Sequence, residues 1–481
     1  MSRDLTLLTD LYQLTMMQGY YNYNINKKVV FDLYYRKNPS GNGYAICAGL
    51  EQAMEYIDNL RFSKEDIDYL RSLDMFEDDF LSYLETFRFT GDIWAIPEGT
   101  VVFPGEPLMR VCAPILEAQY IETALLNIIN HQSLIATKAA RVVEAAEGDA
   151  VLEFGLRRAQ GPDAGVYGAR ATMIGGCAAT SNVLAGKLFD VPISGTQAHS
   201  WVMSFDNELD AFRAYAKVFP NKCILLVDTY DTLKSGIPNA IKVFDELKAE
   251  GKDLKGYGIR LDSGDLSYLS KESRKLLDAA GHEEAIISAS SDLDEYLIAD
   301  LKRQGAKITL WGVGTKLITS SDCSAFGGVY KLSAEENEDG EFEPKIKLSN
   351  NPAKVTTPGI KKVVRIYDKE SRKIKADLIA LDHEEFDENE ELTIFDPIAT
   401  WKKMKLIPGK YTMRELLIPV YKKGESVYES PTVMEIKEYC KQELDSLWCE
   451  QKRLINPAKV PVDLSLELYN LKQKMIAECK E

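Results

Sequence analysis

Apolar segments of strand length recur through the middle of the chain, and segments with helical periodicity separate them. The apolar segments begin near Val151, Val191, Cys223, Tyr257, Ala285 and Ala306. The helical stretches between them lie at 205–218, 239–249, 267–279 and 293–304. A strand, a loop and a helix repeated about every thirty residues predict a parallel sheet made of βα units. Six or more units fit a barrel better than a doubly wound sheet, although periodicity does not decide whether the sheet closes.

The N-terminal part of the chain has a mixed pattern. Residues 5–18 predict a helix that begins near Thr9 or Asp10, with Gln13 three residues after Asp10 as a box-like cap. Gly and Pro interrupt the apolar positions further along, which is typical of short strands joined by turns. Strands are predicted at 28–35 and within 90–112, and a helical region at 115–146.

The pattern changes again after about Leu332. An acidic loop at 333–343 is followed by strand-like alternation within 344–378, and residues 433–481 are mostly helical and amphipathic. Three regions are therefore expected. They are a mixed α+β N-terminal domain at 1–125, an irregular α/β barrel at 126–332 that carries most site residues, and a C-terminal extension at 333–481 whose strands return to the body and which ends in a helical tail.

The composition is that of a globular chain that is too long for one ordinary core. The 481 residues are 45% hydrophobic and 27% charged, which is compatible with two or three domains. The formal net charge is −16 and the sequence pI is about 5.0. This excess of acid argues against a general surface for nucleic acid or anionic membranes, while local basic sites for a phosphorylated small molecule are compatible with it.

The eight cysteines are scattered along the chain. None forms a C-x-x-C pair or a Cys/His cluster with zinc spacing, so a structural metal is not expected. Free thiols in a large acidic chain indicate a reducing compartment. The first residues, MSRDLTLLTD, contain no apolar core of signal-peptide length, and no apolar run reaches membrane-spanning length. The expected location is the cytoplasm, without membrane contact.

Each predicted strand ends in a cluster of side chains that can do chemistry. Loop polarity alone explains any one such cluster. Six in succession predict a shared site, because the carboxyl ends of the strands of a βα-barrel meet on one face. The clusters are Glu153/Arg157/Arg158, Thr196/His199/Ser200, Asp228/Asp231, Arg260/Asp262/Ser263/Asp265, Ser290/Ser291/Asp292 and Gly312/Gly314/Thr315.

His199 stands in the stretch ISGTQAHS and is one of only four histidines. Small and polar residues precede it, as in a strand that opens into a loop. A histidine at such a place is compatible with a structural role when it is considered alone. Beside the other strand-end clusters, it becomes a candidate for chemistry.

Two glycine-rich turns are candidates for phosphate binding. The segment WGVGTKL at 311–317 places a turn after a strand, and its amides can cradle a phosphate. Gly327 and Gly328 form a second turn close behind. Neither G-x-G-x-x-G nor G-x-x-x-x-G-K-[ST] is present, so neither a dinucleotide fold nor a P-loop is indicated. Asp228 and Asp231 are interpreted as rim carboxylates for metal-bound pyrophosphate or for hydrogen bonding, and a structural role fits them equally well.

Six segments in order resemble the nicotinate phosphoribosyltransferase family. Together they span residues 9 to about 332, and KVTTPGIKKVVR (354–365) resembles a further family segment. No single motif would suffice, but six in order are highly specific. The six are TDLYQLTMMQGYY (9–21), EFGLRRAQGPDAG (153–165), GTQAHS (195–200), IRLDSGDL (259–266), GVGTKL (312–317) and GGVYKL (327–332).

The resemblance implies a reaction and an assembly. Family members join nicotinate to 5-phosphoribosyl 1-pyrophosphate, giving nicotinate mononucleotide and pyrophosphate, and couple this step to ATP hydrolysis through a phosphohistidine. They are homodimers with a small N-terminal domain and an irregular α/β barrel, and the active site is shared across the dimer interface. The expected fold class is therefore α/β, an irregular βα-barrel with a mixed N-terminal domain and a C-terminal extension.

The resemblance also assigns roles by position in the matched motifs. His199 corresponds to the phosphorylated histidine. Arg260 and Thr196 correspond to positions that hold nicotinate, Tyr12 to a tyrosine lent by the neighbouring subunit, and Phe154 to its stacking partner. The positions expected to contact phosphoribosyl and phosphate groups are Asp228, Ser263, Gly312, Gly314, Thr315, Gly327 and Gly328.

The chemistry of the reaction agrees with these assignments. Nicotinate is a flat ring with a carboxylate, and Arg260 can grip that carboxylate in a fork that Lys cannot reproduce. The ring nitrogen attacks C1 of the ribose through a transition state with oxocarbenium character, and Asp262 can stabilise that positive charge. Arg157 with Mg²⁺ can stabilise the leaving pyrophosphate. The neutral imidazole of His199 is a good phosphate acceptor.

Structural interpretations stand beside several of these roles. Tyr12 on an apolar helix is by itself typical of a core residue, and Asp262 can form an internal salt bridge with Arg260. Lys354 and Lys361 can meet ATP phosphates or can lie on a solvated strand. No fixed metal site is expected in the protein, because Mg²⁺ would enter with pyrophosphate or ATP.

Other functions stay open from the residues alone. A phosphoribosyltransferase acting on nicotinamide or quinolinate shares this chemistry, because the residues do not show ring selectivity. A barrel that binds a sugar phosphate without turnover has no need of a phosphorylatable histidine. A barrel isomerase or aldolase would need a Schiff-base lysine or a paired acid and base at strand ends, and no lysine occurs in the strand-end runs before Lys316.

Overall fold

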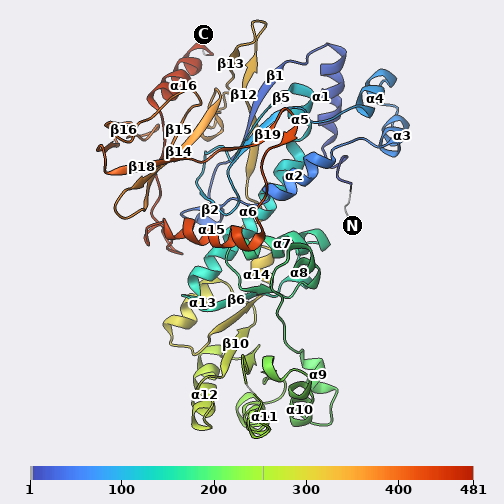
Figure 1. The fold of residues 1–481 in the computed structure, drawn as a ribbon, viewed down its shortest axis with the longest axis vertical. Helices are drawn as coiled ribbons and strands as arrows, with labels where there is room; N and C mark the ends of the chain where they lie inside the picture. Colours follow the sequence, from blue (N-terminus) through green and yellow to red (C-terminus); the bar gives the residue numbers. More distant parts are fainter. Residues whose placement is uncertain (1–3, 253, 480–481) are drawn as a thin grey trace. The chain divides into compact units, whose positions relative to one another are not determined.

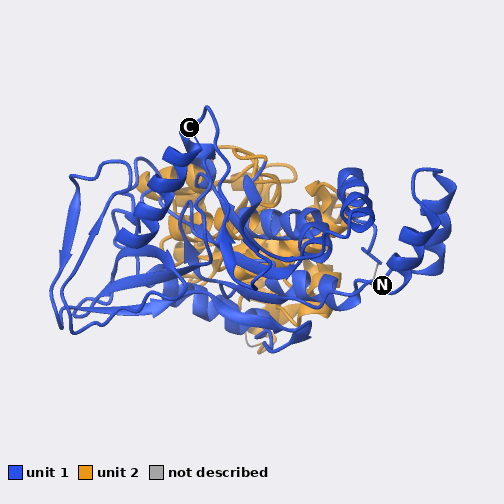
Figure 2. Ribbon diagram, turned by 90° about the horizontal axis from the view of Figure 1, so that it is seen from above, with its two compact units in different colours: residues 1–134, 325–481 blue, residues 135–324 orange. Residues whose placement is uncertain are grey.

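The computed structural model describes residues 4–252 and 254–479. The chain forms two compact units, of which unit 1 comprises residues 1–134 and 325–481 and unit 2 comprises residues 135–324 (Figure 2). One long helix, α6 (Glu122–Ala145), crosses the boundary after residue 134. Residues 333–481, which the sequence predicts as strands returning to the body and a helical tail, belong to unit 1 together with the N-terminal part.

Long-range strand pairing explains why both ends of the chain share one unit. The larger sheet of unit 1 is antiparallel, with the order β13-β12-β1-β5-β3-β19-β20. Figure 1 labels β13, β12, β1, β5 and β19 of this sheet. Strand β1 lies between β5 and β12, so this sheet requires both ends of the sequence. The strands are β1 Lys28–Tyr35, β3 Asp92–Ala95, β5 Met109–Pro114, β12 Gly328–Glu336, β13 Phe342–Pro344, β19 Ile418–Lys422 and β20 Glu425–Ser426.

A second sheet of unit 1 has the order β18-β14-β15-β21. Arg365 on β14 is fully buried in it and lies 2.7 Å from Asp377 and 2.9 Å from Glu443. A buried cation is tolerated only when such partners neutralise it. The strands are β14 Lys361–Asp368, β15 Ile374–Leu381, β18 Tyr411–Glu415 and β21 Val462–Leu464, and the shorter pairs are β2 Ala45–Ile46 with β4 Val101–Val102 and β16 Leu392–Phe395 with β17 Lys403–Leu406.

The helices of unit 1 are interspersed among its strands along the chain. They are α1 Leu11–Asn22, α2 Leu50–Asn59, α3 Lys64–Ser72, α4 Asp78–Glu85, α5 Ile115–Tyr120, α15 Val433–Asp445 and α16 Leu466–Glu478. In the part of the chain that the structure describes, no helix is long and apolar enough to cross a membrane.

The predicted cap of the first helix is wrong in its chemistry. Asp10 is the N-cap residue of α1, but its side chain makes no cap hydrogen bond and instead accepts one from Thr123 at 3.1 Å. Gln13 is fully buried, and its Nε2 donates to Glu122 at 3.0 Å. Hydrogen bonds with residues of α6 therefore engage both side chains that were predicted to form the helix cap.

Unit 2 contains the predicted parallel sheet. Its six strands have the order β7-β6-β11-β10-β9-β8, and all neighbours are parallel. The strands are β6 Ala150–Glu153, β7 Ala179–Thr180, β8 Ile224–Leu226, β9 Gly258–Leu261, β10 Ile286–Ser290 and β11 Leu310–Val313. The helices are α7 Pro162–Ile174, α8 Val183–Phe189, α9 His199–Met203, α10 Glu208–Val218, α11 Ile237–Ala249, α12 Leu266–Ala279, α13 Glu295–Arg303 and α14 Thr315–Ile318.

The strand order confirms an α/β fold with a parallel core, and it follows the cyclic order of a barrel. The last strand, β11, pairs with the first, β6. The strand predicted near Val191 is reduced to one bridge between Ile193 and Thr180. Pro192 offers no N–H to a ladder, which shortens the pairing. Within residues 4–252 and 254–479, no strand pairing joins the Ile193 segment to β8, so closure of the barrel stays a prediction.

Asp463 in β21 makes the stability of unit 1 depend on pH. The side chain is 4% exposed, and burial, reinforced by the charge of Asp396, raises its pKa to about 6. Because the folded pKa lies above the unfolded value of about 3.9, its contribution is favourable below that value and is lost as the pH rises through about 6. We expect Asp463→Asn to raise the free energy of unfolding at pH 8 by up to roughly 3 kcal/mol. The gain should vanish near pH 4.

Denaturant unfolding at both pH values measures this effect. Asp368→Asn is the matched control of opposite sign, because hydrogen bonds from Ser371 lower the pKa of Asp368 to about 2. That variant should lose stability at pH 8. A gain from Asp463→Asn that is equal at pH 4 and pH 8 would contradict the assignment.

Candidate active site

Strand register brings the predicted rim residues of unit 2 together. Leu226 of β8 is level with Arg260 of β9, so Asp228 and Asp262, each two residues further on, lie at the same level. Ser290, the last residue of β10, lies next along the same edge. The carboxyl ends of β8, β9 and β10 thus form the rim that the sequence predicts.

Asp262 is the centre of the hydrogen bonding at this rim. Its Oδ1 accepts a hydrogen bond from the hydroxyl of Ser290, and its Oδ2 lies 3.7 Å from Nε2 of His199. The backbone N–H of Asp262 and the hydroxyl of Ser263 both donate to Oδ2 of Asp228, at 2.8 and 2.7 Å. Asp228 therefore holds the turn after β9, and the Asp262 carboxylate is directed at Ser290 and His199.

His199 is the first residue of helix α9, after Ala198 at the N-cap. Its Nδ1 lies 3.1 Å from the hydroxyl of Thr229, in the loop after β8. The side chain of His199 is 40% exposed. The ring is therefore oriented from two sides and is still accessible to a phosphate donor.

Arg260 holds the segment that precedes His199. Its Nη1 donates to the hydroxyl of Thr196, and its Nη2 donates to the carbonyl of Gln197 at 3.1 Å. Burial lowers the pKa of Arg260, whereas the charges of Asp262 and Asp228 raise it. The guanidinium stays charged, because its ordinary pKa lies far above neutral pH. Arg260 and Thr196, both predicted to bind nicotinate, are thus in direct contact.

Buried polar atoms without hydrogen-bond partners gather around Arg260. They are Nε of Arg260, Oδ1 of Asp228 and both polar atoms of the Gln197 side chain. An unpaired buried group costs about 1–3 kcal/mol, and folded proteins contain few of them. Ordered water or a ligand normally supplies the missing partner. Other such atoms occur elsewhere in the described chain, but these belong to the predicted site residues Arg260 and Asp228 and to the neighbouring Gln197, which favours a binding role for this rim.

Phe154 lies against the predicted phosphate turn. Its backbone N–H donates to the carbonyl of Val313 at 2.8 Å, which continues the pairing of β6 with β11. Gly312 leaves room for the aromatic ring, because a Cβ there would lie 2.7 Å from two ring carbons of Phe154. Thr315 follows Gly314 as the first residue of α14. The aromatic ring and the glycine turn are therefore neighbours.

Glu153, the last residue of β6, links this strand to β7. It is buried and accepts hydrogen bonds from the Thr180 hydroxyl at 2.5 Å and from the Gly155 N–H. Burial raises the pKa of Glu153, although these hydrogen bonds act in the opposite direction. Both contacts support a structural role for Glu153.

Arg157 is exposed in the short 3-10 turn Leu156–Arg158. Its charge is close enough to lower the pKa of Arg260, although burial of Arg260 has the larger effect. Arg157 therefore belongs to the same electrostatic neighbourhood. Its contact with pyrophosphate stays a prediction.

Three predicted site residues lie in unit 1 and not among the strand ends of unit 2. Tyr12 on α1 is 48% exposed, so its interpretation as a core residue is wrong. Gly328 begins β12, and its N–H donates to Oδ1 of Asn130 at 3.1 Å. A side chain at Gly328 would collide with that oxygen, whereas Gly327 has a φ of +77° and open space around it. Packing alone therefore explains the glycine at position 328.

Lys361 has a structural partner that the sequence does not predict. It is 2% exposed, and its Nζ lies 2.7 Å from Asp32 and 2.6 Å from the carbonyl of Gly359. The interpretation as a residue on a solvated strand is wrong, and its amino group is engaged inside unit 1. Lys354 is exposed at the end of the short turn Pro352–Lys354.

The sequence does not predict that Thr229 contacts His199 or that Gln197 contacts Arg260. Thr229 stands directly after the strand-end carboxylate Asp228, and Gln197 lies inside GTQAHS. Adjacency to these motifs is the only sequence signal for either residue. Their contacts depend on how the loop after β8 approaches α9, which no spacing along the chain determines.

The rim offers carboxylates but no preformed metal cage. Among the described residues, no group of three or more His, Cys, Asp or Glu side chains is arranged to hold a metal ion. Asp228 and Asp262 supply oxygen atoms of the kind that Mg²⁺ takes. Mg²⁺ usually binds to one or two carboxylates together with the phosphates of a substrate.

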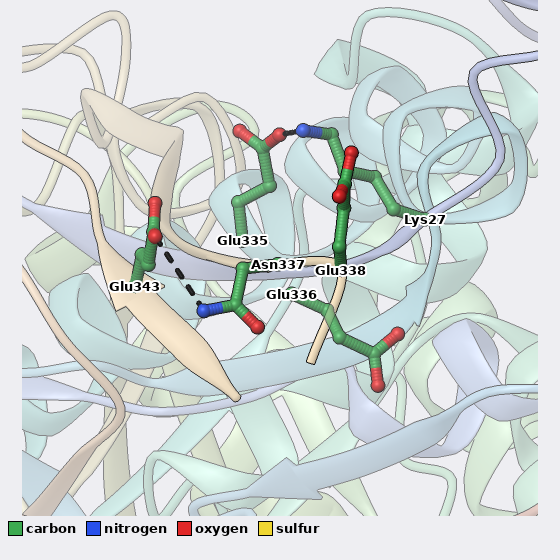
Figure 3. Close-up of a pocket in the computed structure, with 6 residues that line it drawn as sticks. All are labelled: Lys27, Glu335, Glu336, Asn337, Glu338 and Glu343. Carbon is green, nitrogen blue, oxygen red and sulfur yellow. Dashed lines mark hydrogen bonds and ion pairs between the residues drawn. The ribbon is translucent and has the colours of Figure 1, made fainter. Parts of the chain in front are cut away.

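A separate pocket of about 310 Å³ lies in unit 1 and is acidic (Figure 3). Within it Lys27 pairs with Glu335, and the Asn337 amide donates to Glu343 at 3.5 Å. Its carboxylates would repel a phosphorylated substrate, so it is not the candidate site. It is lined by Lys27, Glu335, Glu336, Asn337, Glu338 and Glu343.

Two family models match the chain. The nicotinate phosphoribosyltransferase (NAPRTase) N-terminal domain matches residues 7–130, and the nicotinate phosphoribosyltransferase C-terminal domain matches residues 360–472. Both matched segments belong to unit 1, on either side of the segment that carries His199 and Arg260.

Relatives match over almost the full length. The nicotinate phosphoribosyltransferase of Bacillus subtilis (strain 168) is 48% identical over 477 residues, covering 99% of this chain and 96% of that protein. The nicotinate phosphoribosyltransferase of Caenorhabditis elegans is 37% identical, covering 96% and 92%. The crystal structure of human nicotinic acid phosphoribosyltransferase is similar with a TM-score of 0.85 and 30% identity, covering 97% of this chain and 99% of that chain.

Gly312 provides a test of the packing at the rim. We expect Gly312→Ala to displace the Phe154 ring, because the new Cβ would lie 2.7 Å from two of its carbons. Overpacking of this kind costs about 1–3 kcal/mol of stability. Gly19→Ala in α1 is the control, since a Cβ there meets nothing within 4 Å, and it should leave stability unchanged or slightly higher. Thermal unfolding and a crystal structure of each variant decide the matter, and an unmoved Phe154 ring would refute the expectation.

Proposed function

The chain belongs to the nicotinate phosphoribosyltransferase family, and on that premise we propose that it couples its reaction to ATP hydrolysis through a phosphohistidine at His199. The enzyme joins nicotinate to 5-phosphoribosyl 1-pyrophosphate. One observation carries the coupling proposal. The His199 ring is partly exposed, with Thr229 at one nitrogen and Asp262 near the other.

The other histidines have settings that suit a nucleophile less well. His282 is fully buried, and both of its ring nitrogens are hydrogen-bonded. His383 pairs with Glu467 on the surface of unit 1. His131 lies in α6 and its Nε2 is buried, so that nitrogen is not accessible to a phosphate donor. His199 is the histidine that combines exposure with strand-end neighbours.

Phosphorylation of His199 would change the charge beside the substrate and so its affinity. A neutral imidazole is nucleophilic near pH 7 and can accept the γ-phosphoryl group of ATP. The phosphate would add negative charge and acceptor oxygens beside Asp262, which changes the affinity for the pyrophosphate-bearing substrate. The side chain of His199 is 40% exposed, which leaves its ring open to solvent and to a phosphate donor.

Nicotinate is proposed to bind against Phe154 and Arg260. The aromatic ring offers a flat face, and the guanidinium offers a cation for the carboxylate. Arg260 already donates to Thr196 and Gln197, so the carboxylate would take N–H groups outside these two bonds. The unpartnered Nε is one of them.

5-Phosphoribosyl 1-pyrophosphate is proposed to lie along the strand ends. Asp262 would stabilise positive charge on the ribose carbon, and Arg157 would stabilise the leaving pyrophosphate. Mg²⁺ would enter bound to the substrate and neutralise the same oxygens. In unit 2 the residues proposed to contact phosphoribosyl and phosphate groups are Asp228, Ser263, Gly312, Gly314 and Thr315. The phosphate contacts of Gly327 and Gly328, in unit 1, are a proposal of their own.

We also propose that the enzyme is a homodimer in which Tyr12 of one copy completes the site of the other. Large exposed apolar side chains on both units support this, because association would remove them from water. On the N-terminal segment of unit 1 they are Leu8, Leu11, Tyr12 and Met16, and on and beside α8 they are Val183, Leu184, Leu188 and Ile193.

Phosphate labelling tests the role of His199. We expect His199→Asn to fold normally, to lose acid-labile ³²P incorporation from γ-labelled ATP, and to lose ATP-coupled synthesis of nicotinate mononucleotide. A slow synthesis without ATP should persist, because the ring-binding groups are unchanged. His383→Asn is the control and should keep the label. Label that persists in His199→Asn, or that never appears in an active wild type, would sink the proposal.

Subunit mixing tests the shared site. Tyr12→Ala and His199→Ala should each have little coupled activity, since each lacks one component of every site. After subunit exchange, hybrids should regain part of the activity, because one of their two sites contains both wild-type residues. Tyr12→Phe, which keeps the aromatic face, is the control for Tyr12→Ala. Hybrids that form but regain nothing would place Tyr12 outside the partner's site.

A further inference from the structure

Two contacts determine how the His199 imidazole is protonated. Thr229 Oγ1 lies 3.1 Å from Nδ1, and Asp262 Oδ2 lies 3.7 Å from Nε2. We propose that Thr229 is a positioning residue that reserves Nδ1 of His199 as the phosphate acceptor and then holds the bound phosphoryl group. This inference rests on the proposed phosphohistidine, but its first part concerns the unphosphorylated ring.

The carboxylate decides which nitrogen carries the proton. A neutral imidazole has one N–H and one lone pair, and a carboxylate oxygen can only accept. Nε2 must therefore carry the hydrogen, since a lone pair facing Asp262 would be repelled. The Ser290 hydroxyl donates to the other carboxylate oxygen, so Oδ2 is the one directed at His199.

The remaining lone pair, on Nδ1, then accepts the hydroxyl hydrogen of Thr229. The reverse arrangement, in which Nδ1–H donates to Thr229, would place the Nε2 lone pair against Asp262. A carboxylate on one ring nitrogen that fixes the reactivity of the other is a recurring arrangement in metal sites and in nucleophile–base pairs. Here Asp262 orients the ring, and the Thr229 hydroxyl donates a hydrogen bond to the nitrogen that acts as the nucleophile.

The same hydroxyl can serve before and after phosphoryl transfer. In the transfer, a bond forms between Nδ1 and the γ-phosphorus of ATP while the bond from that phosphorus to the β-phosphate oxygen breaks. ADP leaves with the electron pair, and the proton on Nε2 stays shared with Asp262 or passes to solvent. Thr229 gives up its bond to Nδ1 and can donate instead to a phosphoryl oxygen on the same atom. Bonds from neutral donors to charged oxygens are the stronger kind.

Two substitutions separate the hydroxyl from the space that it fills. Thr229→Val keeps the shape and removes the hydroxyl, and we expect it to slow phosphohistidine formation roughly tenfold or more. It should also shorten the lifetime of the phosphorylated protein. Thr229→Ser keeps the hydroxyl and should stay within a few-fold of wild type. Thr232→Val, three residues further along at the start of the helical turn Thr232–Gly236, is the matched control, and it should leave the Thr229–His199 hydrogen bond in place.

Nitrogen NMR of protein labelled with ¹⁵N-histidine tests the tautomer directly, without ATP. The His199 signals are those that disappear in His199→Asn. In wild type we expect a protonated Nε2 and an unprotonated Nδ1, and in Thr229→Val a more mixed pair of shifts. ³¹P NMR of the labelled protein should then place phosphorus on Nδ1.

The outcomes separate this inference from the function on which it rests. An active wild type that takes up no phosphate refutes the phosphohistidine, and the tautomer measurement still tests the first part of the role of Thr229. A protonated Nδ1 in wild type overturns the inference. So does phosphorus on Nε2, and so does an equal loss in Thr229→Val and Thr229→Ser while wild type is labelled normally.

Discussion

Hydrogen bonds from Arg260 hold the segment that carries His199 in place. Elsewhere in the parallel sheet, strand pairing has this function. After the single bridge at Ile193, no ladder joins this segment to β8 in the described part of the chain. Two donors of Arg260 bind Thr196 and the carbonyl of Gln197 instead. A partly buried guanidinium therefore positions the histidine, and the segment depends on a charge that a ligand can also engage.

Unsatisfied buried polar atoms also occur in the core of unit 1, for example Oδ1 of Asp32 and the Tyr56 hydroxyl, but those around Arg260 lie beside the strand-end side chains. In unit 1 the buried cation Arg365 lies in hydrogen-bonding contact with Asp377 and Glu443, and Lys361 is paired with Asp32. Around Arg260, by contrast, Gln197 has no side-chain partner. A site that must accept a charged substrate keeps such groups available at a cost in stability. The rim thus keeps unpaired polar groups that lower the stability of the fold but can bind a substrate.

The strand register supplies the precision that this segment lacks. Asp228 and Asp262 are level because β8 and β9 are paired, and the Asp228 carboxylate holds the backbone N–H of Asp262. Strand ends therefore orient the carboxylates, while side-chain contacts orient the ring of His199. Groups on regular elements are held more closely than groups on loops, which suits Asp262 to orient the ring.

Local pattern was enough to determine much of this protein from sequence. Periodicity predicted the βα units and the strand at 28–35, and ordered motifs predicted the family, because both are properties of neighbouring residues. Periodicity could not predict that β1 lies between β5 and β12, or that Gln13 bonds Glu122 instead of capping its helix. The buried pair of Lys361 with Asp32 and the contact of Thr229 with His199 were equally beyond it. Each of these joins residues far apart in the chain, and only the folded backbone decides which distant side chains meet.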